Sequence, residues 1–470
     1  MSIYKANIVH TPTKDTFTVI PGGYVVVGDT GRVIGTWQEL PAQYAHLPVT
    51  DYGNRLLIPA FTDLHLHPDQ YPNMGLGYDL ELMPWIAAYA TPVGRFYRDT
   101  HKARRILAAF ITDLWRYGLM RTVQFGPDKW LPCASSTNGL MRTVQFGPLS
   151  AACTDLIFEM MTQSGMGCYL GKNHTDYQKD QHPVESTASS EDAALALIEK
   201  WEGRSPLVHY ILTPSFAPGC TEALMDWVAR TAREKQLPIQ SHLDENRTEV
   251  EMVRRRFISC DSYADVYDRC GMLDRAIPTV MAHCIHTTDE EIALLRDKKV
   301  FVAHCVHSNL DLASGIMPLS RYIDAGIQVG LGSDISGGHT LNMFETMRAT
   351  IQASKVQYTV CGTRPVTASE VFYLATKGGG RFFGKVGAFE SGYSFDALVV
   401  NDCPTMPDGT AYNLQQRMER LIYGGDDRQI QVRFCEGKEI PQPSFSGAET
   451  AHGKTETAKE RETECNRNLI

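Results

Sequence analysis

The middle of this chain alternates strand-like and helix-like segments, and that alternation limits the folds available to it. Short apolar runs are followed by stretches with helical periodicity, such as 221–235 and 288–297. The strand-like runs are 57–66, one copy of a repeated Val-Gln-Phe segment, 167–171, 207–212, 238–242, 279–283, 300–304 and 328–332. Strands that alternate with helices form parallel βα units, and eight such units predict an α/β chain with a TIM-like (β/α)8 barrel.

The second strand is ambiguous because one ten-residue segment occurs twice. The stretches 118–127 and 139–148 are identical, which is too short and isolated a repeat for a solenoid. Only one copy can be the barrel strand, and the other must be accommodated as an insertion. The second copy leads directly into a predicted helix at 151–164, which favours it as the strand, with the first copy as the alternative.

The two ends of the chain differ in character from the middle. Residues 1–58 and 388–440 contain short strand-like runs and turns, and we expect them to form one small β-sandwich domain. Residues 59–387 would then hold the metal-dependent barrel. The segment 441–470 is polar and charged, which predicts a disordered tail.

Composition and charge exclude several classes of function. The chain has 470 residues, a net charge of −9 and no block rich in Lys and Arg, so we expect no binding to nucleic acid or to an anionic membrane. No apolar run approaches the ~18 residues of a membrane span, and the amino terminus lacks a secretory pattern. The twelve cysteines are scattered without a Cys-x-x-Cys pair, which is typical of reduced thiols in a cytoplasmic protein.

Side chains that can bind a metal stand at the ends of several predicted strands. His65 and His67 are two residues apart and therefore project from the same face of a strand. His242 and Asp334 end two later strand-like runs. Three imidazoles and one carboxylate suit Zn²⁺ or Fe²⁺, with one position left for water. A single strand-end histidine more often bonds to the backbone, but four such residues at matching strand ends predict a metal site.

Two further residues could move protons beside this site. Glu245 follows His242 by three residues, so its carboxylate could reach a metal-activated water and a substrate together. The alternative, for Glu245 or for the adjacent Asp244, is an acid at the amino terminus of a helix. His283 could hydrogen-bond the water or the leaving group, and its alternative is an ordinary histidine in a polar pocket.

These motifs resemble the amidohydrolase superfamily and, within it, the guanine deaminases. The superfamily motifs are the stretches 59–67, 240–246, 281–283, 303–310 and 330–334. The narrower resemblance rests on the stretches 70–72, 82–85, 213–214, 241–246 and 375–380. The resemblance covers the chain up to about residue 402 and implies the same barrel fold.

The resemblance also implies a mechanism and a substrate. The ligands of one zinc ion per chain would be His65, His67, His242 and Asp334. Glu245 would shuttle protons, Asp334 would also take a proton from the water, and His283 would orient the attacking group. The end of the fourth strand carries no lysine of the kind that bridges two metals in other members. The implied reaction is the deamination of guanine to xanthine and ammonia, in a homodimeric enzyme.

The predicted substrate pocket departs from that of the relatives. Ser215 stands where guanine deaminases have an arginine that addresses the purine carbonyl, and the segment 172–176 breaks their usual Lys-Val-x-Met-Asp pattern. Gln70 could hydrogen-bond a ring edge, Phe216 could stack on the ring, and Trp85 could form a wall, although such a tryptophan is more often core packing. Two alternatives therefore stay open: deamination of another amino-heterocycle (an aminopurine, pterin or triazine), and a catalytically silent scaffold.

Overall fold

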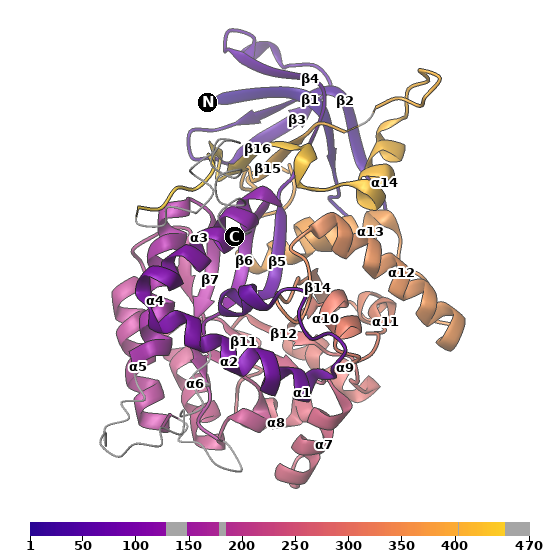
Figure 1. The fold of residues 1–470 in the computed structure, drawn as a ribbon. Helices are drawn as coiled ribbons and strands as arrows, with labels where there is room; N and C mark the ends of the chain where they lie inside the picture. Colours follow the sequence, from indigo (N-terminus) through magenta and orange to yellow (C-terminus); the bar gives the residue numbers. More distant parts are fainter. Residues whose placement is uncertain (128–147, 178–184, 403, 447–470) are drawn as a thin grey trace, which may run out of the picture.

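Eight parallel strands form the centre of the computed structural model, which describes residues 1–127, 148–177, 185–402 and 404–446 (Figure 1). They lie in two four-stranded sheets, ordered β5-β6-β7-β9 and β11-β12-β13-β14. The strands are β5 (Phe61–Leu66), β6 (Leu119–Phe125), β7 (Gly167–Gly171), β9 (Val208–Tyr210), β11 (Ile239–Leu243), β12 (Thr279–His283), β13 (Phe301–His304) and β14 (Gln328–Leu331). A short pair, β8 (Asn173–His174) and β10 (Thr213–Pro214), extends beyond β7 and β9.

Backbone hydrogen bonds join the two four-stranded sheets at both edges. Leu212 pairs in parallel with Ile239, which connects the segment after β9 to β11. At the other edge, the Asp334 N–H donates to the His65 carbonyl at 2.8 Å, and the His67 N–H donates to the Ile335 carbonyl at 2.8 Å. The carboxyl-terminal ends of β5 and β14 therefore lie side by side, and they carry two histidines and an aspartate to one place.

Helices follow most of the parallel strands and cover them on the outside (Figure 1). The helices are α1 (Leu82–Trp85), α2 (Thr91–Val93), α3 (Thr100–Arg116), α4 (Pro148–Ser164), α5 (Thr187–Trp201), α6 (Glu222–Lys235), α7 (Arg247–Arg256), α8 (Tyr263–Arg269), α9 (Asp289–Lys298), α10 (Val306–Asp311), α11 (Leu319–Asp324), α12 (Met343–Cys361), α13 (Ala368–Tyr373) and α14 (Leu414–Gly424). The segments expected to be helical at 221–235 and 288–297 are α6 and α9. Across the described ranges, we find no helix with the length and apolar character that crossing a membrane requires.

The local sequence explains where these helices begin. Thr221 precedes α6, and its hydroxyl accepts a hydrogen bond from the Leu224 N–H. Thr288 precedes α9 and forms a reciprocal capping box with Glu291. Such caps satisfy backbone N–H groups that have no partner inside the helix. The helices thus start at fixed positions, after the short loops that follow the strand ends.

The first copy of the repeated segment supplies the second strand. Strand β6 lies in that copy, pairs with β5 and β7, and is buried along its whole length. The prediction that favoured the second copy is therefore wrong, and residues 139–147 lie outside the described residues. A direct connection to a helix does not distinguish the copies, because α3 also leads straight into β6 through Gly118, whose φ of 73° permits the sharp turn.

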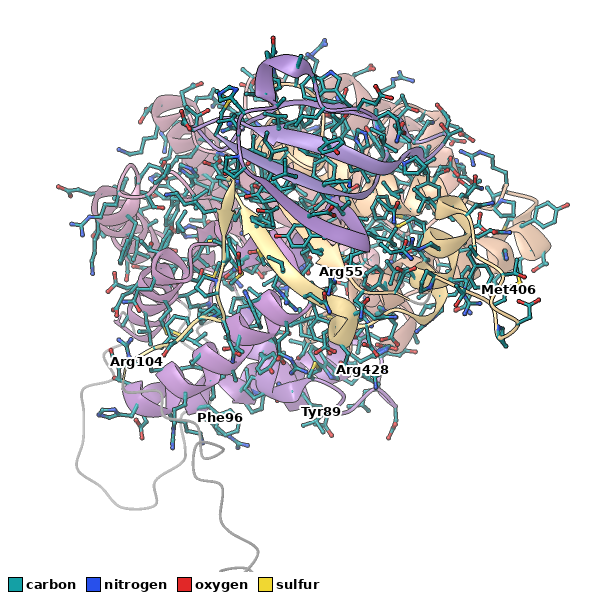
Figure 2. The ribbon with its side chains drawn as sticks, turned by 90° about the horizontal axis from the view of Figure 1, so that it is seen from above. Arg55, Tyr89, Phe96, Arg104, Met406 and Arg428 are labelled. Carbon is teal, nitrogen blue, oxygen red and sulfur yellow. The ribbon has the colours of Figure 1, made fainter. Side chains whose placement is uncertain are left out.

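Both ends of the chain contribute to one seven-stranded sheet, which lies above the parallel strands in Figure 1. Its order is β17-β16-β15-β4-β1-β2-β3. The strands are β1 (Ser2–His10), β2 (Thr18–Val27), β3 (Val33–Trp37), β4 (Val49–Pro59), β15 (Ala397–Val400), β16 (Ile430–Cys435) and β17 (Lys438–Glu439). Strands from the two chain ends lie side by side, where β4 pairs with β15, and Figure 2 shows them with Arg55 and Arg428 labelled nearby. Of the predicted tail, Phe445 is buried against the main core, and 447–470 lie outside the described residues.

A buried ion pair ties the seven-stranded sheet to the parallel strands. The Arg121 guanidinium on β6 contacts the Asp396 carboxylate at 2.6 Å, and both side chains are almost fully buried. Burial opposes ionisation of Asp396, but the charge and hydrogen bonds of Arg121 hold its pKa below the usual range. Arg121 also contacts Glu436 at 3.1 Å. This ion pair therefore links the two parts of the fold. Removing either charged group alone would leave the other one buried without a partner.

Candidate active site

Three histidines meet at the carboxyl-terminal ends of the parallel strands. His65 is the next-to-last residue of β5, His67 directly follows the strand, and His242 lies in β11. One nitrogen from each of the three rings lies within 4.8 Å of the corresponding nitrogens of the other two. The rings of His65 and His242 are 4.7 Å apart between centroids and nearly perpendicular. The alternation of side chains along β5 explains how His65 and His67 reach the same point.

Asp334 completes this set of four donors. Its Oδ1 lies 3.2 Å from His65 Nε2 and 3.3 Å from His67 Nε2. The Nδ1–H of His242 donates to the Ser215 carbonyl at 2.6 Å, which leaves Nε2 to face the other donors. Three imidazole nitrogens and one carboxylate oxygen match the donor chemistry of a catalytic divalent transition metal.

Electrostatics favour the protonation states that a metal ligand needs. Burial lowers the pKa of His65 to about 3 and that of His242 to about 3, so both imidazoles are neutral at physiological pH. Burial opposes ionisation of Asp334, but the His65 imidazole and the hydrogen bonds from His65 and His67 hold its pKa well below the usual range. His65 and His242 therefore present neutral nitrogens, and Asp334 presents an ionised carboxylate.

A second group of acid–base residues adjoins the first. Ligand-type atoms of Glu245, His283 and Asp334 lie within 4.8 Å of one another. His283 Nε2 is 3.5 Å from Glu245 Oε2 and 3.7 Å from Asp334 Oδ2. The Nδ1–H of His283 donates to Asn309 Oδ1 on α10 at 2.9 Å, which fixes the orientation of the ring. Burial, followed by the charges of Glu249 and Asp334, raises the pKa of Glu245 well above its ordinary value, so this carboxyl can hold a proton and deliver it.

The backbone at this site adopts conformations that side chains rarely tolerate. His283 has a φ of 73°, Asp334 a φ of 48° and Asp244 a φ of 51°. Non-glycine residues in the left-handed region cost free energy and cluster at functional sites. The unusual backbone turns at the ends of β12 and β14 aim His283 and Asp334 at the same point.

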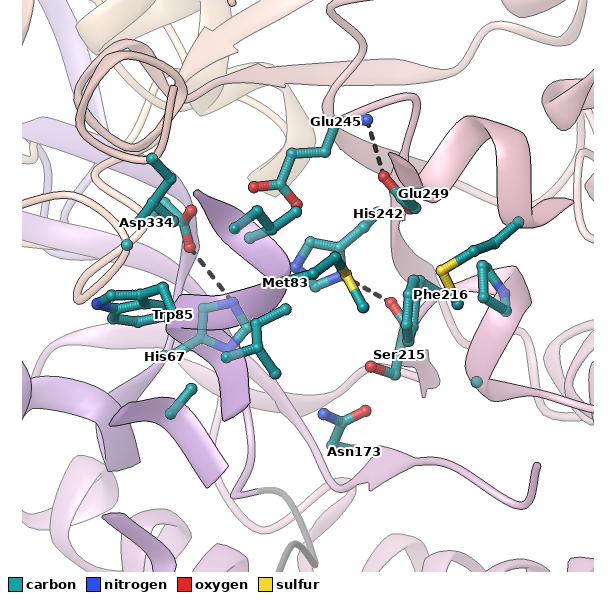
Figure 3. Close-up of a pocket in the computed structure, with 18 of the residues that line it drawn as sticks. His67, Met83, Trp85, Asn173, Ser215, Phe216, His242, Glu245, Glu249 and Asp334 are labelled. Carbon is teal, nitrogen blue, oxygen red and sulfur yellow. Dashed lines mark hydrogen bonds and ion pairs between the residues drawn. The ribbon is translucent and has the colours of Figure 1, made fainter. Parts of the chain in front are cut away.

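A cavity of about 590 Å³ lies directly over these side chains (Figure 3). The predicted pocket residues Gln70, Trp85, Ser215 and Phe216 all line it. The Trp85 indole N–H donates to the Leu76 carbonyl at 2.9 Å. This hydrogen bond holds the ring in place as part of the cavity wall. A largely apolar cavity of this volume with a few convergent polar groups fits a small flat heterocycle.

The structure adds residues that the sequence analysis did not identify. Asn173, Tyr177 and Arg256 line the cavity, and Asn309 orients His283. The broken pattern at 172–176 was a signal for Asn173. Asn309 belongs to one of the superfamily motifs. No sequence pattern indicated a role for Arg256, which is the last residue of α7.

Comparisons with known protein sequences identify the family of this chain. Residues 56–440 match the model of the amidohydrolase family. The chain is 30% identical to the guanine deaminase of Dictyostelium discoideum over 473 residues, which cover 94% of this chain and 98% of that protein.

Solved structures have a similar fold. A crystal structure of guanine deaminase from C. acetobutylicum with bound guanine is similar, with a TM-score of 0.85, 38% identity, and coverage of 93% of this chain and 99% of that one. A mutant atrazine chlorohydrolase from Arthrobacter aurescens, complexed with zinc and atraton, has a TM-score of 0.79 at 16% identity over the full length of both chains, a likeness of fold alone. The resemblance seen in the sequence is thereby confirmed: this chain belongs to the amidohydrolase family.

Proposed function

We propose that this protein is a metal-dependent aminohydrolase that deaminates guanine to xanthine and ammonia. The observation that carries this proposal is the convergence of a four-donor metal set with a protonatable glutamate at one end of a cavity sized for a purine. The relatives named as guanine deaminases, one of them with guanine bound, support the choice of substrate.

The donor set favours zinc, with iron(II) as the second choice. The ligands would be His65, His67, His242 and Asp334. A zinc ion held by them would supply activated water at neutral pH, because it lowers the pKa of water toward about 7. One set of four donors implies one metal ion per chain.

The protein's own side chains would move the protons. Asp334 Oδ2 and His283 Nε2 lie 3.7 Å apart, so they can hold an attacking water between them, with Asp334 accepting its proton. Glu245, protonated because of its burial, would donate to the ring nitrogen as the water oxygen bonds to the amine-bearing carbon. The proton that Asp334 took from water then goes to the departing amine, which leaves as ammonia. The new hydroxyl group gives its proton to Glu245 as the product carbonyl forms, which restores the protonated glutamate.

The cavity would hold the ring in place. Gln70 can hydrogen-bond a ring edge, and Phe216 can stack on the flat face. Ser215 contributes a neutral hydroxyl, and its carbonyl fixes His242. Since the neutral Ser215 stands where guanine deaminases have a charged arginine, deamination of another aminopurine, a pterin or a triazine is the second candidate function.

We also infer the finer features of the fold. Hydrogen bonds at both sheet edges support a closed (β/α)8 barrel over 59–387. The separate core of Tyr4, Ile8, Val25, Phe395 and their neighbours supports a β-sandwich domain built from 1–58 and 388–440. Homodimeric assembly and a cytoplasmic location remain predictions from the sequence.

The direct test is turnover of guanine by protein loaded with one equivalent of zinc. We expect guanine to disappear as equal amounts of xanthine and ammonia form, and His242→Ala to abolish the reaction because it removes a metal ligand. If guanine is inert at full metal occupancy while a pterin or triazine releases ammonia, the substrate assignment is wrong. If no ring is consumed, the scaffold alternative is correct.

A further inference from the structure

One wall of the cavity, next to a metal-ligand histidine, carries two neutral polar side chains. Strand β8 pairs with β10 so that Asn173 lies opposite Thr213. The Ser215 N–H donates to the His174 carbonyl at 3.0 Å. This pairing holds Asn173 and Ser215 next to each other, and Figure 3 shows both side chains at the same side of the cavity. The Asn173 amide and the Ser215 hydroxyl are both buried from bulk solvent.

The arginines that line the cavity are engaged elsewhere. Arg256 donates to the carbonyls of Ala217 and Pro218, at 3.2 and 2.7 Å, and to that of Cys220 at 2.5 Å. Its guanidinium also lies 3.4 Å from the centroid of the Tyr177 ring.

Arg255 is also not positioned to hydrogen-bond a substrate. It is paired with Glu251, and its side chain is 78% exposed. Arg255 and Arg256 are the cationic side chains among the described residues that line the cavity. Within the described part of the chain, no cationic side chain is therefore placed beside Ser215 to hydrogen-bond a substrate carbonyl.

The remaining acid of the cavity is also engaged. Glu249 accepts a hydrogen bond from the Glu245 N–H at 3.1 Å and another from the Tyr263 hydroxyl at 2.6 Å. Among the described lining residues, and apart from the metal and proton-transfer groups, the remaining polar groups include the amides of Gln70 and Asn173 and the hydroxyls of Ser215 and Tyr177. Each of these can both donate and accept hydrogen bonds, whereas an arginine can only donate.

We propose that Asn173 and Ser215 form a neutral reading edge, which binds a purine through a ring substituent that is either a carbonyl or an amine. This inference rests on the proposed function and deepens it. The substrate class becomes aminopurines that carry an oxo or an amino group at that edge, with guanine as one member. Asn173 is thus a specificity-determining residue, because its amide can present either its C=O or its NH₂ to the ring.

Two substitutions with opposite effects test the reading edge. Calorimetry would measure binding of guanine and of 2,6-diaminopurine to the zinc-loaded Glu245→Gln protein, in which the bound ring is not consumed. We expect both rings to bind with dissociation constants within about tenfold of each other, since a neutral edge serves either substituent. Asn173→Asp leaves only acceptors and should favour the diaminopurine. Ser215→Arg adds a donor-only group and should favour guanine, each by about tenfold or more.

The matched control is Met83→Leu, a change of shape on another wall of the same cavity, which should leave the ratio of the two dissociation constants unchanged. The inference is overturned if both polar substitutions weaken the two rings by the same factor, or if neither ring binds. Turnover is measured separately in protein that retains Glu245. Binding without turnover there would contradict the deaminase proposal and leave the reading edge supported.

Discussion

The adjacent carboxyls Asp244 and Glu245 provide a sharp test of which side chain moves protons. Glu245 lines the cavity and lies 3.5 Å from His283 Nε2, whereas Asp244 is not among the described residues that line it. Glu245→Gln keeps the size of the side chain but cannot carry a proton. A positioned acid–base group contributes about 10²–10⁴-fold to a rate, so kcat should fall by that factor, roughly 3–5 kcal/mol of activation free energy.

The same substitution should make the metal-free protein more stable at neutral pH. Burial and the charges of Glu249 and Asp334 raise the pKa of Glu245 well above 4.5 in the folded state. The folded protein therefore binds this proton more tightly than the unfolded chain, and its unfolding free energy falls as the pH rises above about 4.5. Glutamine carries no charge at any pH. The variant should match the parent below about pH 4 and exceed it at pH 7 in chemical denaturation.

Steady-state ammonia release and the metal content of each protein decide the question. Asp244→Asn is the matched control, because asparagine tolerates the φ of 51° at this position, and it should keep most of the activity. The reasoning fails if fully metal-loaded Glu245→Gln retains more than a tenth of the parental kcat. It also fails if Asp244→Asn loses as much activity as Glu245→Gln.

Three further predictions concern the surroundings of the site. Asn309→Leu should lower kcat about 10–100-fold at unchanged metal content, because His283 loses the acceptor that orients it; equal rates would show that the ring needs no such support. Arg121→Met should lower the unfolding free energy by about 3–5 kcal/mol at pH 7 by leaving the Asp396 charge unpaired. Because the pair lowers the pKa of Asp396, the stability difference should shrink as the pH falls below about 4, and a difference independent of pH would contradict the pairing. The bound metal should survive dialysis at pH 5, since the pKa of the buried His65 is about 3; loss of metal near pH 6 would contradict it.

The convergence of His65, His67, His242 and Asp334 could be predicted from the sequence because strand periodicity is a local property. His65 and His67 share a strand face by alternation alone, and His242 and Asp334 follow apolar runs whose ends meet in parallel sheets. The convergence of the four side chains follows from topology, since strand ends of one polarity gather at one face. The prediction therefore did not depend on side-chain contacts between distant segments.

The features that were missed depend on contacts between distant segments. The two repeated copies are identical, so local preference cannot choose between them, and the choice rests on packing of β6 between β5 and β7. Arg256 reaches the cavity because α7 ends beside the turn at 217–219. Asn173 reaches it through the pairing of β8 with β10, two-residue strands that are too short to be predicted from periodicity.

In the proposed mechanism, one metal ion held by the strand-end histidines and Asp334 drives deamination of guanine. The most direct test is to titrate zinc into metal-free protein while xanthine formation is measured. We expect activity to rise linearly and to reach its maximum at one zinc ion per chain. Full activity without metal, or a maximum at two ions per chain, would contradict the assignment of this site.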